Sequence, residues 1–166
     1  MIATRALVLC LAATALATAS TLADSGTATI AVSATVRRNC TITTAPLAFG
    51  TYDPVVANAT TPLDATATVT IACTMGTPAT IGLDAGSNAL ASQRRLTNAS
   101  SAYMNYQMFL DSAHATMWGN DSSNQMDAGT APSKAPRAFS VYGRIPAGQD
   151  VPIGPFSDSV VATVNF

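Results

Sequence analysis

Apolar and polar residues alternate along several separate stretches of the chain, and a period of two is typical of β-strands with one buried face. The clearest stretch is 65–73, in which one face carries Ala65, Ala67, Val69, Ile71 and Cys73. Further strands are expected within 27–36, 40–44, 79–86, 101–112, 138–145 and 157–166, and residues 47–52 form a further short apolar segment. No segment shows the 3.6-residue apolar stripe of a helix. About six or seven strands between Cys40 and Phe166, separated by turn residues, predict an all-β antiparallel sandwich.

The last alternating stretch ends the sequence as given. Its apolar face carries Val160, Ala162, Val164 and Phe166. An immunoglobulin-like sandwich normally has one more strand at this point. Without it, we expect a row of unpaired backbone groups and an open slot in the core.

A spare strand is present at the other end of the sequence, ahead of Cys40. Residues 27–36 are poor in charge and place Ala28, Ile30, Val32, Ala34 and Val36 on one face. This row of small and medium apolar side chains is suited to filling such a slot in a neighbouring molecule. Folding back into the slot of its own chain is an alternative that the linker length alone does not forbid.

The N-terminus has the features of an export signal. Arg5 precedes a short apolar run, and Ala17-Thr18-Ala19 fits a cleavage site. We therefore expect a signal peptide at 1–19, with cleavage after residue 23 as an alternative, and a retained membrane anchor as the competing interpretation. An extension at 20–38 and a domain at 39–166 would follow.

Removal of that segment leaves two cysteines, Cys40 and Cys73. An even pair in an exported chain predicts a disulfide, and two buried free thiols are the alternative. A disulfide closing a loop of this length would stabilise the fold by roughly 3.5–4 kcal/mol.

Composition argues against several classes of function. The net charge is −1 and only 10% of residues are charged, so there is no basic field for nucleic acid. His114 is the only histidine and no Cys-x-x-Cys occurs, so we expect no metal site. No glycine-rich phosphate loop follows a strand, and we expect no cofactor.

Three residues that are close together in the sequence resemble the members of a catalytic triad: Ser112, Asp111 and His114. A triad requires convergence in space, and the sequence around His114 favours a solvated loop histidine instead. We therefore predict that the protein is not an enzyme.

Three other features have structural interpretations. Trp118 is expected in the core or at its rim. Arg94-Arg95 is expected in a solvated turn. Residues 119–136 are rich in Gly, Asn, Asp, Ser and Pro, which favours a mobile loop.

Four segments together resemble the spore coat protein U domain family, which includes archaic chaperone–usher pilins of the Csu type. The segments are "NCTITTAPLAFGTYDP", "VTIACTMGTPATIGLDAG", "RRLTNASSAYMNYQMFLDSAHATMWGN" and "VYGRIPAGQDVPIGPFSDSVVATVNF". The resemblance extends from about Asn39 to Phe166. The final element begins with Phe156, where many relatives have Tyr.

The resemblance implies an incomplete immunoglobulin-like antiparallel β-sandwich that lacks its last strand and is completed by a donor strand. In such pilins a periplasmic chaperone first lends a strand. At an outer-membrane usher, the extension of the next subunit replaces it. The donor side chains would then be Ala28, Ile30, Val32, Ala34 and Val36. The acceptor edge, which the chaperone also binds, would carry Val160, Ala162, Val164 and Phe166. The family's disulfide would be Cys40–Cys73.

The function implied by the resemblance is that of a structural fimbrial subunit. It would be exported to the periplasm, assembled with other pilin subunits at the cell surface, and would support attachment and biofilm formation. The alternatives are a tip-associated or secreted surface-binding protein, and a spore or cell coat protein of the same fold.

Overall fold

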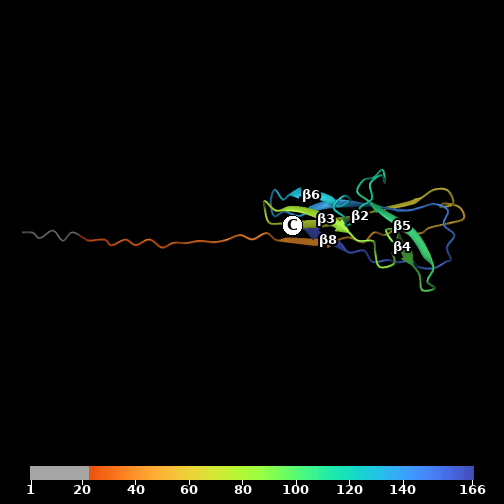
Figure 1. The fold of residues 1–166 in the computed structure, drawn as a ribbon, viewed down its shortest axis with the longest axis horizontal. Coiled ribbons are helices and arrows are strands. Elements are labelled where there is room, and N and C mark those ends of the chain that lie inside the picture. The colour runs from red at the N-terminus through yellow and green to blue at the C-terminus, as the bar shows by residue number, and fades with distance from the viewer. Residues whose placement is uncertain (1–22) are drawn as a thin grey trace, which may run out of the picture. The chain divides into compact units, whose positions relative to one another are not determined.

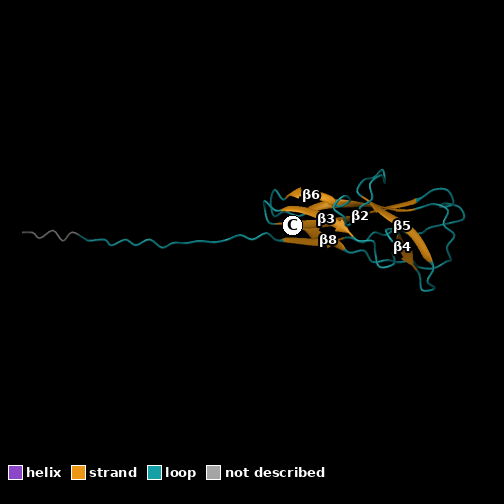
Figure 2. Ribbon diagram, viewed as in Figure 1, coloured by secondary structure: helices purple, strands orange, loops and turns teal. Residues whose placement is uncertain are grey.

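The computed structural model describes residues 23–166, and the expected signal peptide at 1–19 lies outside the described residues. The chain divides into two units, Met1–Thr35 and Val36–Phe166. Residues 23–35 are exposed and form neither helix nor strand, although an alternating strand is expected from 27 (Figure 2). No helix in the described part of the chain is both long and apolar enough to cross a lipid bilayer.

The second unit is built from β-strands (Figure 1). Within residues 23–166 the strands are β1 Cys40–Thr44, β2 Leu63–Cys73, β3 Pro78–Leu83, β4 Arg94–Thr97, β5 Tyr103–Phe109, β6 Met126–Thr130, β7 Arg137–Ile145 and β8 Ala162–Asn165. Every pairing between them is antiparallel. The all-β prediction is confirmed.

The strands form two sheets. One has the order β1-β2-β7-β5-β4 and the other the order β6-β3-β8. β1 and β8 are therefore outer strands, each hydrogen-bonded on one side only within the described residues. They lie against each other without pairing. This arrangement is an incomplete immunoglobulin-like sandwich, as predicted.

The core follows the alternation along β2. Val69, Ile71 and Cys73 are buried, whereas the residues between them are more exposed. Cys73 forms a disulfide with Cys40, which lies directly opposite on β1. Trp118 is fully buried and its indole N–H donates a hydrogen bond to the Ile81 carbonyl at 2.8 Å, so the core assignment of this residue is confirmed.

Two expectations about loops are wrong. Residues 119–136 contain β6, which pairs with β3, and the expected solvated turn at Arg94-Arg95 is instead the start of β4. These short strands bring the number between Cys40 and Phe166 to eight rather than six or seven. Arg94 is only 3% exposed, because its guanidinium donates to backbone carbonyls that the fold brings around it.

Candidate functional site: an open groove between β1 and β8

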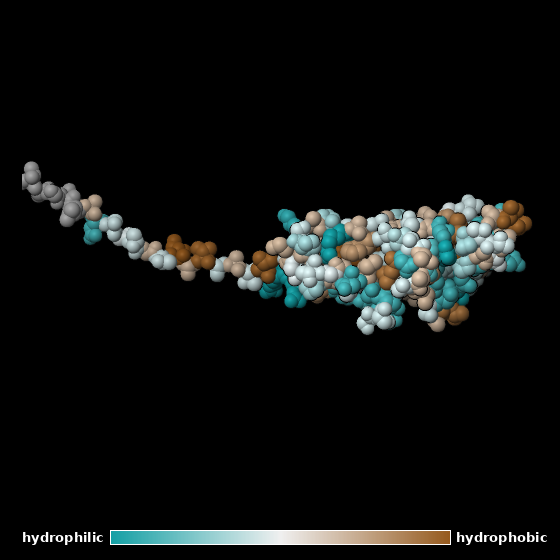
Figure 3. All heavy atoms as spheres, turned by 90° about the horizontal axis from the view of Figure 1, so that it is seen from above, coloured by the Kyte–Doolittle hydropathy of each residue, from teal (hydrophilic) through white to brown (hydrophobic). Residues whose placement is uncertain are grey.

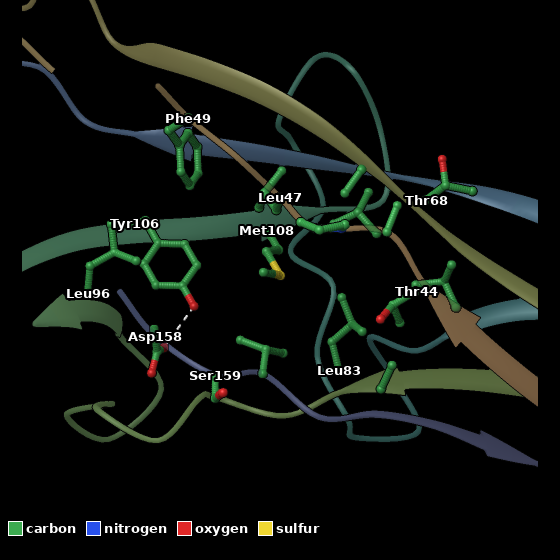
Figure 4. Close-up of a pocket in the computed structure, with 17 residues that line it drawn as sticks. Thr44, Leu47, Phe49, Thr68, Leu83, Leu96, Tyr106, Met108, Asp158 and Ser159 are labelled. Carbon is green, nitrogen blue, oxygen red and sulfur yellow. Dashed lines mark hydrogen bonds between the residues drawn. The ribbon is translucent and has the colours of Figure 1, made fainter. Parts of the chain in front are cut away.

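The free edges of β1 and β8 border a cavity of about 260 Å³ that opens into the core (Figure 4). Its wall is mainly apolar and comes from both sheets and from the segment after β1. The lining includes Leu47, Phe49, Ala67, Val69, Leu83, Leu96, Tyr106, Met108, Val141, Val160 and Ala162. In a complete sandwich, a strand between β1 and β8 would cover this position. The cavity is therefore the open slot that the sequence predicts.

The segment after β1 covers one side of the groove. The side chains of Leu47 and Phe49 pack against β7 at Gly143, where a Cβ atom would lie 2.6 Å from Leu47 Cδ2 and 2.8 Å from Phe49 Cζ. The Phe49 ring also meets the Tyr106 ring edge to face, with centroids 6.1 Å apart. Gly143 thus leaves the space that these two side chains fill.

A hydrogen-bonded polar pair lies at one end of the groove. The Tyr106 hydroxyl donates to Asp158 Oδ2 at 2.8 Å (Figure 4). The Asn88 side chain donates to Asp158 Oδ1 at 2.8 Å. Burial, followed by the hydrogen bond to Asp158, raises the pKa of Tyr106. The phenol therefore stays neutral and holds Asp158 in place. Gly86 has a φ of +85°, and a Cβ atom there would collide with the Asp158 carboxylate.

The groove continues into a second hollow of about 710 Å³ beneath the loops that follow β1 and β7. The two cavities share four lining residues, Leu47, Phe49, Leu96 and Asp158. The second hollow is closed on its far side by the 151–157 segment, including Phe156. The accessible slot is consequently longer than β8 itself.

The structure places two of the four expected acceptor residues at this groove. Val160 and Ala162 line the cavity, and Val164 packs against the core. Phe166 is half exposed at the end of the strand. Only Ala162 and Val164 lie within β8, because regular pairing with β3 begins at Ala162. The role of these four residues as an acceptor edge stays a prediction.

The expected donor residues lie in the exposed extension. Ile30 is 84% exposed and Val32 is 89% exposed, and Ala28, Ala34 and Val36 are exposed as well. Their role as donors also stays a prediction.

Sequence reasoning did not single out four residues that line the groove, Leu47, Phe49, Tyr106 and Asp158. For Leu47 and Phe49 the sequence offered one indication, the short apolar segment "LAFGTY", to which no strand was assigned.

The triad-like residues do not assemble a catalytic site. The side chain of His114 is 7% exposed and packs between the rings of Phe109 and Tyr142, so the expectation of a solvated histidine is wrong. The carboxylate of Asp111 accepts the backbone N–H groups of Ala115 and Thr116. Within residues 23–166, no cluster of three or more His, Cys, Asp or Glu side chains is placed to hold a metal ion.

Fold and groove define an immunoglobulin-like sandwich that is open between two outer strands. The family model described as the Spore Coat Protein U domain matches residues 26–163. Protein U of Myxococcus xanthus is 38% identical over 130 residues, which cover 72% of this chain and 71% of that protein. The chain belongs to the Spore Coat Protein U domain family.

A solved structure also shares the fold. It is a chaperone–tip adhesion subunit pre-assembly complex from the archaic chaperone–usher Csu pili of Acinetobacter baumannii. The match has a TM-score of 0.58 at 20% identity and covers 80% of this chain but only 41% of that one. The similarity at this identity shows a common fold.

Proposed function

We propose that this chain is the structural subunit of a surface fibre, exported by a chaperone–usher pathway and polymerised by donor-strand exchange. The extension of one copy fills the groove between β1 and β8 of the next. The fibre supports attachment to surfaces and biofilm formation. The observation that carries the proposal is an open groove together with an exposed extension whose apolar residues alternate, both in the same chain.

The extension and the groove are chemically complementary. A strand placed between β1 and β8 pairs its backbone with both free edges, while every second side chain enters the apolar cavity. The extension presents five apolar side chains at that spacing, with mostly Thr and Ser between them. Burying one exposed Ile or Val side chain is worth about 1.5–3 kcal/mol. The main-chain bonds and the row of side chains together favour a long-lived joint.

The same open groove requires protection before assembly. An exposed apolar slot with free strand edges promotes aggregation. A periplasmic chaperone that lends its own strand fills the slot during transit, and an outer-membrane usher is the place of exchange. The chaperone's strand and then the donor strand pair with the same edge, which carries Val160, Ala162, Val164 and Phe166. Residues 1–19 act as the cleaved export signal, and residues 20–38 as the donor extension of the domain at 39–166.

The test uses variants of the extension in the cells that make the protein. Deletion of residues 27–36, or Ile30→Asp, is expected to abolish polymers that survive detergent without boiling, because a buried unpaired charge is costly. Thr29→Asp is the matched control: it adds the same charge one residue away, on the opposite face, and is expected to preserve the polymers. Normal polymers from the deletion variant would refute the donor assignment.

A second variant tests the groove itself. Residues 27–36 are repeated after Phe166 through a short flexible linker, which gives a groove-filled chain. Because β8 ends at Asn165, directly before Phe166, the added strand can return beside β8 as a hairpin. This chain is expected to be a soluble monomer without a chaperone and to accept no donor. Its continued incorporation as an acceptor would contradict the proposal.

A coat protein is the second candidate, favoured by the family description and by the 38% identity to Protein U. Immunogold electron microscopy separates the candidates. Label along thin fibres supports the fimbrial subunit, label confined to fibre ends indicates a tip-associated adhesion protein, and a continuous layer indicates a coat.

A further inference from the structure

The chain's own extension is a second strand that could fill the groove between β1 and β8. Only residues 37–39, which we call the connector, separate its last apolar residue, Val36, from Cys40 at the start of β1. Three residues are a common length for the loop of a β-hairpin. Figure 3 shows apolar side chains exposed along the extension. A strand from a second copy and the chain's own strand therefore compete for one groove.

A hairpin made with the connector would turn the apolar face of the extension inward. Val36 would lie opposite Cys40, and Ala34 opposite Ile42. Directly opposed residues of an antiparallel pair lie on the same face of the sheet. Both Cys40 and Ile42 pack against the core, so the side chains opposite them would do the same.

The free edge of β1 presents the backbone groups that such a hairpin needs. The Asn39 carbonyl and the Ala45 N–H bond to the β2 side. Backbone groups of successive residues in a strand point to opposite sides, so those of residues 40, 42 and 44 point toward the groove. Neither the side chains nor the backbone of β1 would prevent the extension from filling its own groove.

The two ways of filling the groove differ in strand direction. β2 runs toward the Cys40–Cys73 disulfide, and β3 runs back from it after a turn in which the Thr77 N–H donates to the Thr74 carbonyl. β8 is antiparallel to β3 and so runs toward the disulfide, whereas β1 runs away from it. A hairpin strand is antiparallel to β1 and parallel to β8, and a donor antiparallel to β8 is parallel to β1. Strand direction therefore gives neither arrangement a clear advantage.

Proximity favours the chain's own extension. A strand tethered by a short flexible linker is present at an effective concentration on the order of millimolar, whereas a second copy arrives at its concentration in solution. Without an opposing interaction, most chains would fill their own grooves and accept no donor. The proposed function therefore requires a feature that keeps the extension available.

Hydrogen bonds from Thr74 oppose a turn in the connector. The Thr74 N–H donates to the Asn39 carbonyl at 2.9 Å. The Thr74 hydroxyl donates to the Arg37 carbonyl at 3.2 Å and lies 3.4 Å from the Asn39 carbonyl oxygen. These bonds extend the β1–β2 ladder beyond Cys40 and hold Arg37 on the β2 side. In a hairpin, Arg37 would have to leave Thr74 and cross to the groove side of β1.

We propose that Thr74 is a positioning residue that holds the connector in line with β1 and thereby directs the extension to a second copy of the chain. The inference rests on the proposed function. It gives a role in strand exchange to a residue that lines neither of the two groove cavities. Loss of one neutral hydrogen bond is expected to change the ratio of the two arrangements several-fold.

The test compares three substitutions with the parent chain. Thr74→Val removes the hydroxyl and keeps the shape, and Thr74→Ser keeps the hydroxyl. Thr70→Val is the matched control, because Thr70 is another partly exposed threonine of β2 and lies four residues away. Each chain is purified with its disulfide intact, unfolded in guanidinium chloride and refolded by dilution without a chaperone. Monomers and detergent-resistant polymers are then separated, and hydrogen exchange of residues 28–36 is measured in the monomers.

Thr74→Val is expected to raise the monomeric fraction several-fold, and its monomers should show slow hydrogen exchange at residues 28–36. Thr74→Ser and Thr70→Val are expected to match the parent. A role of Thr74 in stability alone would leave residues 28–36 of the monomers in fast exchange.

Two outcomes separate this inference from the proposed function. Parent polymers together with an unchanged monomeric fraction in Thr74→Val, or with fast exchange at residues 28–36 in its monomers, would overturn the role of Thr74 alone. A parent chain that forms no polymers and leaves residues 28–36 in fast exchange would overturn the proposed function, and the role of Thr74 with it.

Discussion

Replacement of Arg94 by methionine tests whether a single buried cation holds together the segments around Leu83 and Trp118. The guanidinium donates to the carbonyls of Leu83 at 3.0 Å and Trp118 at 2.8 Å, and twice to that of Asp84, at 2.6 and 2.9 Å. It therefore joins the end of β3 to the loop that carries Trp118. Burial lowers the pKa of Arg94, and the nearby Tyr106 and acidic groups oppose that shift.

The magnitude follows from these contacts. A hydrogen bond to a charged group contributes about 1.5–3 kcal/mol, and a buried carbonyl left without a donor costs about 1–3 kcal/mol. Methionine retains much of the apolar volume, so cavity formation adds little. Arg94→Met is expected to lower the free energy of unfolding by about 3–5 kcal/mol. With a urea dependence of about 2 kcal/mol per molar, the midpoint shifts by roughly 1.5–2.5 M.

The assay is urea unfolding of the groove-filled chain, followed by the fluorescence of Trp118. This residue is the only tryptophan and is fully buried, so its emission reports loss of the core. Arg95→Met is the matched control. Arg95 is partly exposed, stacks over Tyr103 and donates to the Asn88 carbonyl, so its loss is expected to cost about 1 kcal/mol or less. Equal small losses in the two variants would refute a special role for Arg94.

Three further variants test the disulfide, the groove wall and the acid response. Replacing Cys40 and Cys73 by alanine is expected to lower the free energy of unfolding by about 3.5–4 kcal/mol, and an unchanged urea midpoint would contradict the loop-entropy estimate. Gly143→Val is expected to cost about 1–3 kcal/mol by displacing the two side chains packed against it, which a matched Ala138→Val change should not do. The hydrogen bonds from Arg144 hold the pKa of Asp64 below its ordinary value, so this stabilisation is present above about pH 4 and is lost as the pH falls further. The urea midpoint of Asp64→Asn should therefore fall less between pH 6 and pH 3 than that of the parent. The difference should be small, because the carboxylate is 44% exposed. An equal fall in both proteins would show that this ion pair does not contribute to the acid response.

Sequence reasoning succeeded where burial alternates along a long strand. In β2, β5 and β7 every second side chain enters the core, so the period of two is visible without knowledge of neighbours. The position of the disulfide is visible for a similar reason, because only two cysteines follow the expected signal. The open edge could be inferred from the apolar face of the final alternating stretch.

The same reasoning failed where distant segments determine the structure. β4 and β6 are four and five residues long, with the sequences "RRLT" and "MDAGT", and their polar composition resembles that of a turn. Pairing with β5 and β3 makes them strands. Arg94 and His114 are charged or polar residues buried by neighbours from other parts of the chain, and no local pattern predicts that burial.

Under the proposed donor assignment, the polar residues of the extension would restrict the strand to one face of insertion. Because the side-chain period of a strand is two, a shift by one residue would turn Ile30 and Val32 outward and direct Thr29 and Ser33 into an apolar cavity. Burial of a hydroxyl group in an apolar cavity without a hydrogen-bond partner is penalised. A shift by two residues keeps the apolar face inward and moves each side chain one position along the groove. In the proposed fibre, the alternation would therefore fix which face enters, and the short connector to Cys40 would limit the register.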